Sequence, residues 1–445
     1  MILANIPVPH DIPLPLPVDR VILQAVIVLL FLAHIVFINL MLGGAMFAVV
    51  FECIGLKRRD FDTLAREITH TITVNKSLAV VLGVGPLLAI NVLYTVYFYS
   101  ANALTGYVWI SIVPLVAVAF LILYAYKYSW ERLANRKKLH LAMGGFGVAI
   151  LLFVPLIFLS NINLMLFPDR WTQVRGFLSA LWLPNVWPRF LHFVLACVAV
   201  SALFMLAYFT RAGYPVETKF QGLDRPNLRR LFYGIAFGAT LLQLAAGPLV
   251  LFTLPAQGLS VFLYAVIGTG AAFAVAMLAL MWWEILTPRQ TAGRFFVPIV
   301  ALLILTGSAM GFGRHVYREG ALRDHRLAME QRTQDLAYAA AAAKWRADHG
   351  VAVEDLPLGQ RVFRDVCSSC HMLDRVLTGP SIREIAELYK DDPDGIVRWT
   401  KAPTRKRTGF PAMPAFDRPT EQLRAVAEYM LELAAPKKEG LSPES

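Results

Sequence analysis

Eight apolar runs separated by short polar segments make up most of the chain between residues 21 and 313. Each run is long enough to cross the hydrocarbon core of a membrane as an α-helix, which takes about 20 residues. The pattern therefore predicts eight transmembrane helices, with both ends of the bundle on the same side of the membrane. The predicted spans are 21–52, 73–99, 107–129, 142–167, 189–210, 231–254, 260–286 and 295–313.

The hydropathy pattern changes on both sides of this predicted membrane domain, 20–313. Residues 1–19 contain five prolines and no Lys or Arg, which predicts an extended segment. The first apolar run is too long for a cleavable signal peptide, so none is expected. Residues 314–349 are charged and then alanine-rich, which predicts a helical stalk. A domain at 350–436 and a short tail at 437–445 complete the predicted all-α fold.

Composition agrees with a membrane protein, because 57% of the residues are hydrophobic and only 16% are charged. The net charge of +11 does not indicate nucleic-acid binding. From Arg314 to the end there are 21 basic and 20 acidic residues, so the soluble part is nearly neutral. The positive excess lies in the loops of the membrane domain.

Cys367-Ser-Ser-Cys370-His371 is a C-x-x-C-H motif. Its spacing lets both sulfurs form thioethers with the vinyl groups on one edge of a haem, and the histidine can ligate the iron. A zinc site or a redox-active cysteine pair is the competing interpretation, and the flanking residues favour haem. The remaining cysteines, Cys53 and Cys197, lie in apolar runs, so we expect them to pack there without a disulfide.

Two flanking segments suit a covalently bound haem c. Gly379 and Pro380 follow at a distance from which a backbone carbonyl can orient the His371 ring. Met413 lies on a proline-bracketed loop and offers a thioether. Residues 350–436 resemble a class I cytochrome c, and this resemblance makes Met413 the sixth ligand of the iron.

Two independent signals predict the orientation in the membrane. Haem c is attached on the outer side of an energy-coupling membrane, so the final domain and the N-terminus are expected in the periplasm, with the bundle in the inner membrane. The loops then predicted inside (53–72, 127–141, 211–230 and 287–294) carry 16 Lys and Arg, whereas the outer segments carry 2. This asymmetry follows the positive-inside rule.

Three histidines fall within or at the ends of predicted spans, where ionisable groups are rare and often functional. His34, His192 and His315 all lie toward the predicted outer side. For a single histidine at a helix end, an interfacial hydrogen bond is the more common role. Three at a similar depth, together with a cytochrome c, favour haem b held between helices by imidazole.

The membrane part resembles subunit I of the cytochrome bd quinol oxidases. The resemblance rests on the segment from His34 to Gly43, on Arg189-Phe-Leu-His192, and on shorter matches at Leu82-Gly-Val-Gly85, Trp130-Glu-Arg-Leu133 and Gly313-Arg314. It implies that His34 ligates a high-spin haem b and that His192 ligates a low-spin haem b. It also implies a second membrane subunit as partner.

The chain also departs from that family. Residues 107–129 contain no Asp or Glu, where the family has acidic residues serving its oxygen site. The family has an acidic residue just before its Gly-Arg near the last helix, whereas Met310-Gly-Phe precedes Gly313 here, and the family's long quinol-binding loop is reduced to residues 255–259. The methionine partner of the low-spin haem is not evident near Val266. We therefore hypothesise that His315 stands opposite His192 as the second ligand.

Other polar residues receive simpler predictions. His70 and His140 are expected at the inner membrane face, with a quinone site as the alternative, while His10, His325 and His349 are expected in solvent. Lys76 and Glu284 lie near inner helix ends, where they can reach the interface. The basic run from Lys401 to Arg407 is expected on a solvated face, or as a surface for an acidic redox partner.

Three functions remain open from the sequence. The first is a membrane cytochrome with one haem c and one or two haem b, passing electrons between the quinone pool, or a membrane partner, and a periplasmic redox protein or enzyme. Quinone is then a further candidate cofactor. The second is a terminal reductase of oxygen or nitric oxide fed by the cytochrome c. The third is a haem-free membrane anchor, which leaves His34 and His192 unexplained.

Overall fold

The computed structural model describes residues 16, 18–72, 76–287, 293–333, 336, 356–376, 379–404 and 413–435. Within these ranges the chain is helical without a β-strand, and an isolated bridge pairs His371 with Val376. The all-α prediction is therefore confirmed. The chain divides into two compact units, Met1–Thr333 and Gln334–Ser445.

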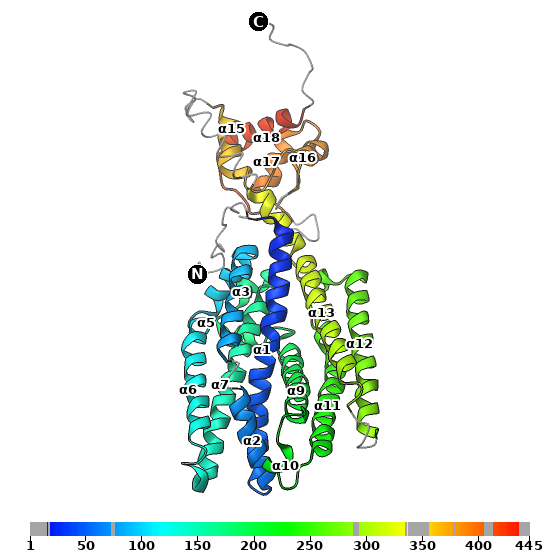
Figure 1. Ribbon diagram of the computed structural model, residues 1–445. Helices are drawn as coiled ribbons and strands as arrows, with labels where there is room; N and C mark the ends of the chain where they lie inside the picture. The colour runs from blue at the N-terminus through cyan, green and yellow to red at the C-terminus, as the bar shows by residue number, and fades with distance from the viewer. Residues whose placement is uncertain are drawn as a thin grey trace. The chain divides into compact units, whose positions relative to one another are not determined.

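The first unit is a bundle of long apolar helices (Figure 1). Among the described residues, seven helices can cross a membrane, and up to eight if the bent pair α3–α4 is one span. The helices are α1 (Arg20–Gly55), α2 (Arg59–Ile72), α3 (Lys76–Leu93), α4 (Thr95–Thr105), α5 (Tyr107–Ile110), α6 (Ile112–Tyr128), α7 (Lys137–Leu164), α8 (Phe177–Leu181), α9 (Val186–Thr210), α10 (Val216–Lys219), α11 (Arg225–Phe252), α12 (Val261–Leu286) and α13 (Phe296–Ala321).

The first and last helices of the bundle meet at one end. Arg20, at the start of α1, forms a 3.0 Å salt bridge with Glu319 near the end of α13. We call this end the terminal end, and the opposite end, where α1 meets α2, the loop end. Returning the chain to the terminal end requires an even number of crossings. The bent pair α3–α4 is then the candidate for the eighth crossing.

The predicted span 73–99 is bent rather than straight. The axis turns by 110° between α3 and α4, and Tyr94 at the corner has φ −128° and ψ 38°. The Thr95 hydroxyl donates a 2.6 Å hydrogen bond to the Asn91 carbonyl at this corner. Such side-chain bonds compete with regular helix geometry. Tyr94, Tyr97 and Phe98 are buried beneath the turn, so tertiary packing holds the bend.

Two regions outside the predicted spans are also helical. The predicted loop 53–72 contains the amphipathic helix α2, which buries Leu64, Ala65 and Ile68 against the bundle. Helix α13 continues past 313 to Ala321, and residues 323–333 are helical as well. These residues are the first part of the predicted stalk. The rest of 314–349, apart from residue 336, and the tail 437–445 lie outside the described residues.

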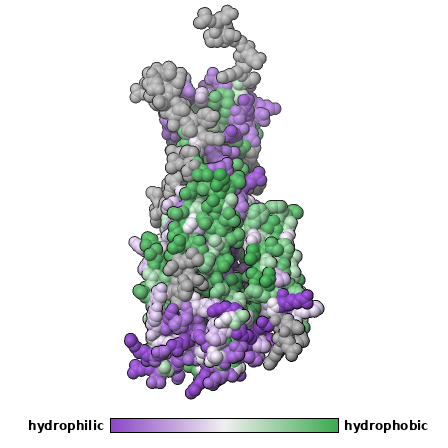
Figure 2. All heavy atoms as spheres, viewed as in Figure 1, coloured by the Kyte–Doolittle hydropathy of each residue, from purple (hydrophilic) through white to green (hydrophobic). Residues whose placement is uncertain are grey.

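The surface of the bundle matches its predicted setting. Figure 2 shows a broad hydrophobic band over the helices and a hydrophilic zone at the loop end, around α2 and α10 in Figure 1. Inside, one buried cluster fills the loop-end half around Phe51, Phe209 and Phe232. A second cluster around Tyr97, Phe98 and Trp171 lies beneath the α3–α4 corner.

The second unit is a small helical domain. Its hydrophobic core includes Val362, Ile382, Ile396 and Leu423. A glycine allows two of its helices to cross closely, because a Cβ at Gly359 would lie 2.1 Å from the Ala425 carbonyl oxygen. Its helices are α15 (Leu358–Val362), α16 (Ile382–Tyr389), α17 (Pro393–Lys401) and α18 (Thr420–Ala434), with a π turn η5 (Phe363–Cys367).

Candidate functional site

The C-x-x-C-H motif begins where η5 ends. The backbone N–H groups of Cys370 and His371 both donate to the Cys367 carbonyl, at 3.1 and 3.0 Å, which folds the motif into a compact turn. Both cysteines are half-buried and form no disulfide. Burial raises the pKa of Cys367 to about 11, and the charge of Cys370 acts in the same direction. Neither sulfur is used in a disulfide, so both are available for thioether formation.

The His371 ring is held by the two residues predicted to orient it. Nδ1 lies 2.8 Å from the Pro380 carbonyl oxygen. A carbonyl only accepts, so Nδ1 carries the proton and Nε2 keeps a lone pair for iron. The ring lies directly against Gly379, where a Cβ would stand 2.3 Å from Cε1. The donor set therefore fits a haem c ligand.

Met413 is half-buried and lies in the described segment just before α18. Residues 405–412, which precede it and include most of the predicted basic run, lie outside the described residues. No described contact links Met413 to His371. Its role as the sixth iron ligand stays a prediction.

His34 on α1 has the same ring environment as His371. Its Nδ1 lies 3.0 Å from the Ala79 carbonyl oxygen on α3, which again leaves the Nε2 lone pair free. The ring packs on a glycine, since a Cβ at Gly83 would lie 2.8 Å from Cε1. A half-buried imidazole fixed in this way fits a haem b ligand.

His192 on α9 and His315 on α13 each have a buried Nδ1 without a hydrogen-bond partner. The Gln243 amide lies 3.4 Å from Nε2 of His192, a long contact. No hydrogen bond joins the two histidines in the described structure. Unpartnered buried nitrogens are costly and point to a ligand at each ring. Whether both serve one iron stays a hypothesis.

Three arginines accompany these histidines at the terminal end. Arg189 lies three residues before His192 on α9, and Arg314 and Arg318 lie one helical turn apart on α13. The three charges act on one another, yet no described carboxylate pairs with any of them. Glu319 pairs with Arg20 and Arg326 instead.

Arg314 lies over the Phe31 ring and Arg318 over the Tyr94 ring, and a group of cations within a bundle also favours a nearby anion, because charge is costly there. Nη1 of Arg318 is buried without a partner, which supports the same need. The two propionate groups of a haem b would supply that negative charge. In the sequence, Arg189 and Arg314 stand out only as parts of the segments that resemble the bd quinol oxidases, and no pattern indicates Arg318.

Helices α1 and α9 cross closely on the loop-end side of His34 and His192. A Cβ at Gly43 would lie 2.2 Å from the Cys197 carbonyl oxygen. The Ser201 hydroxyl donates to the Asn39 carbonyl at 2.8 Å, and the Cys197 thiol lies 3.2 Å from the Asn39 side-chain oxygen. Cys197 therefore packs in the bundle, as expected. The crossing determines the relative height of His34 and His192.

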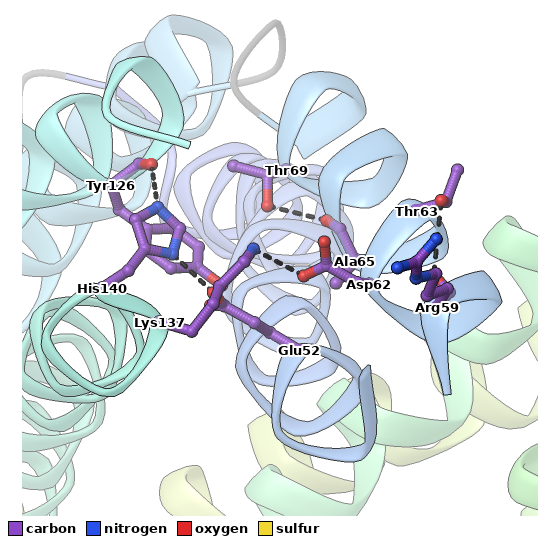
Figure 3. A network of polar contacts seen from close by, with 9 residues as sticks. All are labelled: Glu52, Arg59, Asp62, Thr63, Ala65, Thr69, Tyr126, Lys137 and His140. Carbon is purple, nitrogen blue, oxygen red and sulfur yellow. Dashed lines mark hydrogen bonds and ion pairs between the residues drawn. The ribbon is translucent and has the colours of Figure 1, made fainter. Parts of the chain in front are cut away.

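The loop end contains a separate polar network (Figure 3). Glu52 and His140 are completely buried, with Nδ1 of His140 2.6 Å from the Glu52 carboxylate. Tyr126 donates its hydroxyl to Glu52 at 2.7 Å, and Lys137 bridges Glu52 and Asp62 at 3.4 and 2.6 Å. Glu52 was missed from the sequence, although it is the one acidic residue in the first predicted span.

This network does not suit the quinone alternative for His140. Its Nε2 bonds to the Tyr126 carbonyl at 2.8 Å, so both ring nitrogens are occupied within the protein. His70 is exposed. Glu284 does not reach the interface, because its buried carboxylate accepts hydrogen bonds from the N–H groups of Gly293 and Phe295. The side chain of Lys76 lies outside the described residues.

Comparison with known proteins bears on both units. Residues 354–430 match the family model of cytochrome c oxidase, cbb3-type, subunit III. The structure of bd oxidase from Geobacillus thermodenitrificans is similar, with a TM-score of 0.53 and 15% identity over 68% of this chain and 87% of that chain. Most of that share must come from the bundle, since the second unit begins at Gln334. No curated protein matches the chain in sequence.

The expected resemblances are therefore confirmed at the level of domain type and fold. The second unit contains a cytochrome c domain of the cbb3 subunit III type, and the bundle is a multi-pass membrane structure with a bd oxidase-like fold. Together these features identify the chain as a membrane cytochrome of electron transfer.

Proposed function

We propose that the chain passes electrons between the quinone pool, or a membrane partner, and a periplasmic redox protein. Haem c would be bound by Cys367, Cys370 and His371, with Met413 as the sixth ligand. One or two haem b groups would be held in the bundle by His34 and His192, with His315 as the further candidate. Bound haem supplies a centre that accepts and releases single electrons.

The terminal-end donor set carries this proposal. His34 offers a free Nε2 because Ala79 engages Nδ1. His192 and His315 have unpartnered ring nitrogens, and three arginines nearby lack a carboxylate among the described residues. Imidazoles for iron and cations for propionates are the complementary parts of a haem site. A simple anchor would have no need for either.

The proposed orientation places the terminal end on the periplasmic side. The salt bridge between Arg20 and Glu319 supports an even number of crossings, and the basic loops at the opposite end favour the cytoplasm. The haem b ligands would then lie on the same side of the membrane as haem c. By resemblance to the bd oxidases, we also propose a second membrane subunit.

A reduced spectrum tests the function. An electron conduit needs no open iron, so we expect dithionite to give one haem c and one or two haem b per chain, and carbon monoxide to leave the bands unchanged. A carbon monoxide shift in the b bands would reveal an open iron and favour the terminal reductase. Haem c without haem b would reduce the bundle to an anchor.

A further inference from the structure

The helical residues that follow α13 bury one side and expose the other. Leu322 is 1% exposed, and His325 and Arg326 are half-buried, while positions 323, 324, 327 and 328 are exposed. Residues three and four apart share one face of a helix, so the first three form a single covered face. These residues belong to the first unit, which extends to Thr333. The first part of the stalk therefore lies against the bundle.

Aromatic packing holds this face in place. The His325 ring centroid lies 5.4 Å from that of Tyr97 on α4 and 5.9 Å from that of Trp171 in η2 (Pro168–Gln173). The Tyr97 hydroxyl lies 3.1 Å from Nδ1 of His325. Leu322 belongs to the same buried cluster as both aromatic residues. The structure thus corrects the expectation that His325 is simply solvated.

Glu319 joins the covered face to two other elements. Its carboxylate accepts hydrogen bonds from the Tyr94 hydroxyl at 2.5 Å, from Arg20 at 3.0 Å and from Arg326 at 3.0 Å. Tyr94 is the corner between α3 and α4, and Arg20 begins α1. Hydrogen bonds to a charged group are among the stronger ones in proteins. We call Glu319, Leu322, His325 and Arg326 the stalk dock.

The end of α13 is also held from a second side. The Tyr317 hydroxyl donates to the Pro255 carbonyl at 3.0 Å, and a Cβ at Gly258 would lie 2.5 Å from the Tyr317 ring. Helical hydrogen bonding then continues past the end of α13, since the Arg326 N–H donates to the Leu322 carbonyl at 2.9 Å. Helix α13 and the stalk dock thus form one continuous support.

We propose that the stalk dock is a positioning device for electron exchange between the bundle and the cytochrome c domain. The proposal rests on the proposed function, in which both units bind haem. Undocking would add residues 322–333 to the connection that leads to α15, which otherwise has the 24 residues 334–357. A flexible linker that grows by half of its length lowers the effective concentration of its two ends about twofold. The dock therefore raises the frequency with which the cytochrome c domain meets the bundle.

The experiment compares two leucine substitutions in the full-length, haem-loaded protein. Leu322→Arg places a charge in the buried dock, whereas Leu327→Arg adds the same charge at a position that is 44% exposed. Spin labels at the exposed positions Tyr99→Cys and Ala328→Cys, in a Cys53→Ser background, report docking through their distance distribution. Flash reduction of haem c then measures the rate at which the electron equilibrates with haem b.

We expect the wild type and Leu327→Arg to give one narrow distance distribution and equal transfer rates. Leu322→Arg should give a broad distribution and about twofold slower transfer, while reduction of haem c by an external donor stays unchanged. Arg326→Gln removes the ion pair with Glu319 and should act in the same direction. Arg326→Lys keeps the cation and should stay near the wild type in both measurements.

A broad distribution in the wild type would show that the stalk is not docked and would overturn the proposal. An unchanged transfer rate in Leu322→Arg, with a broad distribution, would overturn it as well. If Leu322→Arg misfolds and loses haem b, the two Arg326 variants decide by the same measurements. Absence of haem b from the wild type would instead refute the proposed function, while the spin labels would still report docking.

Discussion

His371 in the cytochrome c domain and His34 in the bundle make the same kind of contact, a hydrogen bond from Nδ1 to a backbone carbonyl, but they obtain it differently. In the cytochrome c domain, His371 bonds to the Pro380 carbonyl only 9 residues away. In the bundle, His34 bonds to the Ala79 carbonyl 45 residues away, on another helix. Both rings lie against a glycine. A local segment suffices for the first site, whereas helix packing must assemble the second.

The largest expected effect concerns covalent attachment in the local site. A Cys367→Ser, Cys370→Ser double variant has no sulfur to form a thioether, so we expect complete loss of covalent haem. Haem staining of a denaturing gel measures this loss. Cys53→Ser should keep full staining, because Cys53 is an exposed residue of α1. Staining that survives the double change would refute the haem c site.

The assembled site should lose its haem without affecting the local one. His34→Ala removes the free imidazole on α1, so we expect the ratio of haem b to haem c to fall, while haem c remains. His192→Ala should act in the same direction. Pyridine haemochrome spectra measure the ratio. The exposed His70→Ala is the control. An unchanged ratio in both variants would mean that other residues hold haem b, and would refute this ligand assignment.

The buried network at the loop end should matter for stability rather than for haem. Glu52→Ala leaves Nδ1 of His140 and the Tyr126 hydroxyl without their acceptor, while Lys137 keeps Asp62, and breaking a buried ion pair costs about 3–5 kcal/mol. We expect a lower thermal midpoint with an unchanged haem ratio at low temperature. Glu131→Ala breaks the exposed pair with Arg66 and should cost at most about 1 kcal/mol. Equal losses of stability in Glu52→Ala and Glu131→Ala would contradict the burial of the Glu52 network.

The smallest effect tests the glycine that lies against the histidine ring in each site. Gly83→Ala places a methyl 2.8 Å from Cε1 of His34, and overpacking costs about 1–3 kcal/mol. We expect a displaced ring, a shifted haem b band and partial loss of haem b. Gly379→Ala should perturb haem c in the same way. The control is Gly145→Ala, where a new Cβ would meet nothing within 4 Å. A normal haem b band in Gly83→Ala would show that Gly83 does not position His34 in the way that Gly379 positions His371.

Prediction from the sequence was most complete where a feature depends on residues that are close to one another along the chain. The haem motif, the helical class and the number of apolar spans are visible as spacing and hydropathy. The 110° turn at Tyr94 was not, because Thr95 and Asn91 compete with the helix only weakly and buried tyrosines complete the bend. Glu52 was missed since its partners lie on other helices, and Arg318 since the charge it acts on, Arg189, lies on another helix.

By itself the sequence determined a membrane bundle followed by a cytochrome c domain, because apolar run length and the C-x-x-C-H spacing are local properties of the chain. Tertiary structure decided which groups face each other. It brings Ala79 and Gly83 to His34, gathers three arginines near His192 and His315, and sets Glu52 against His140. These contacts depend on helix register and crossing, which arise from packing many side chains at once rather than from any single segment.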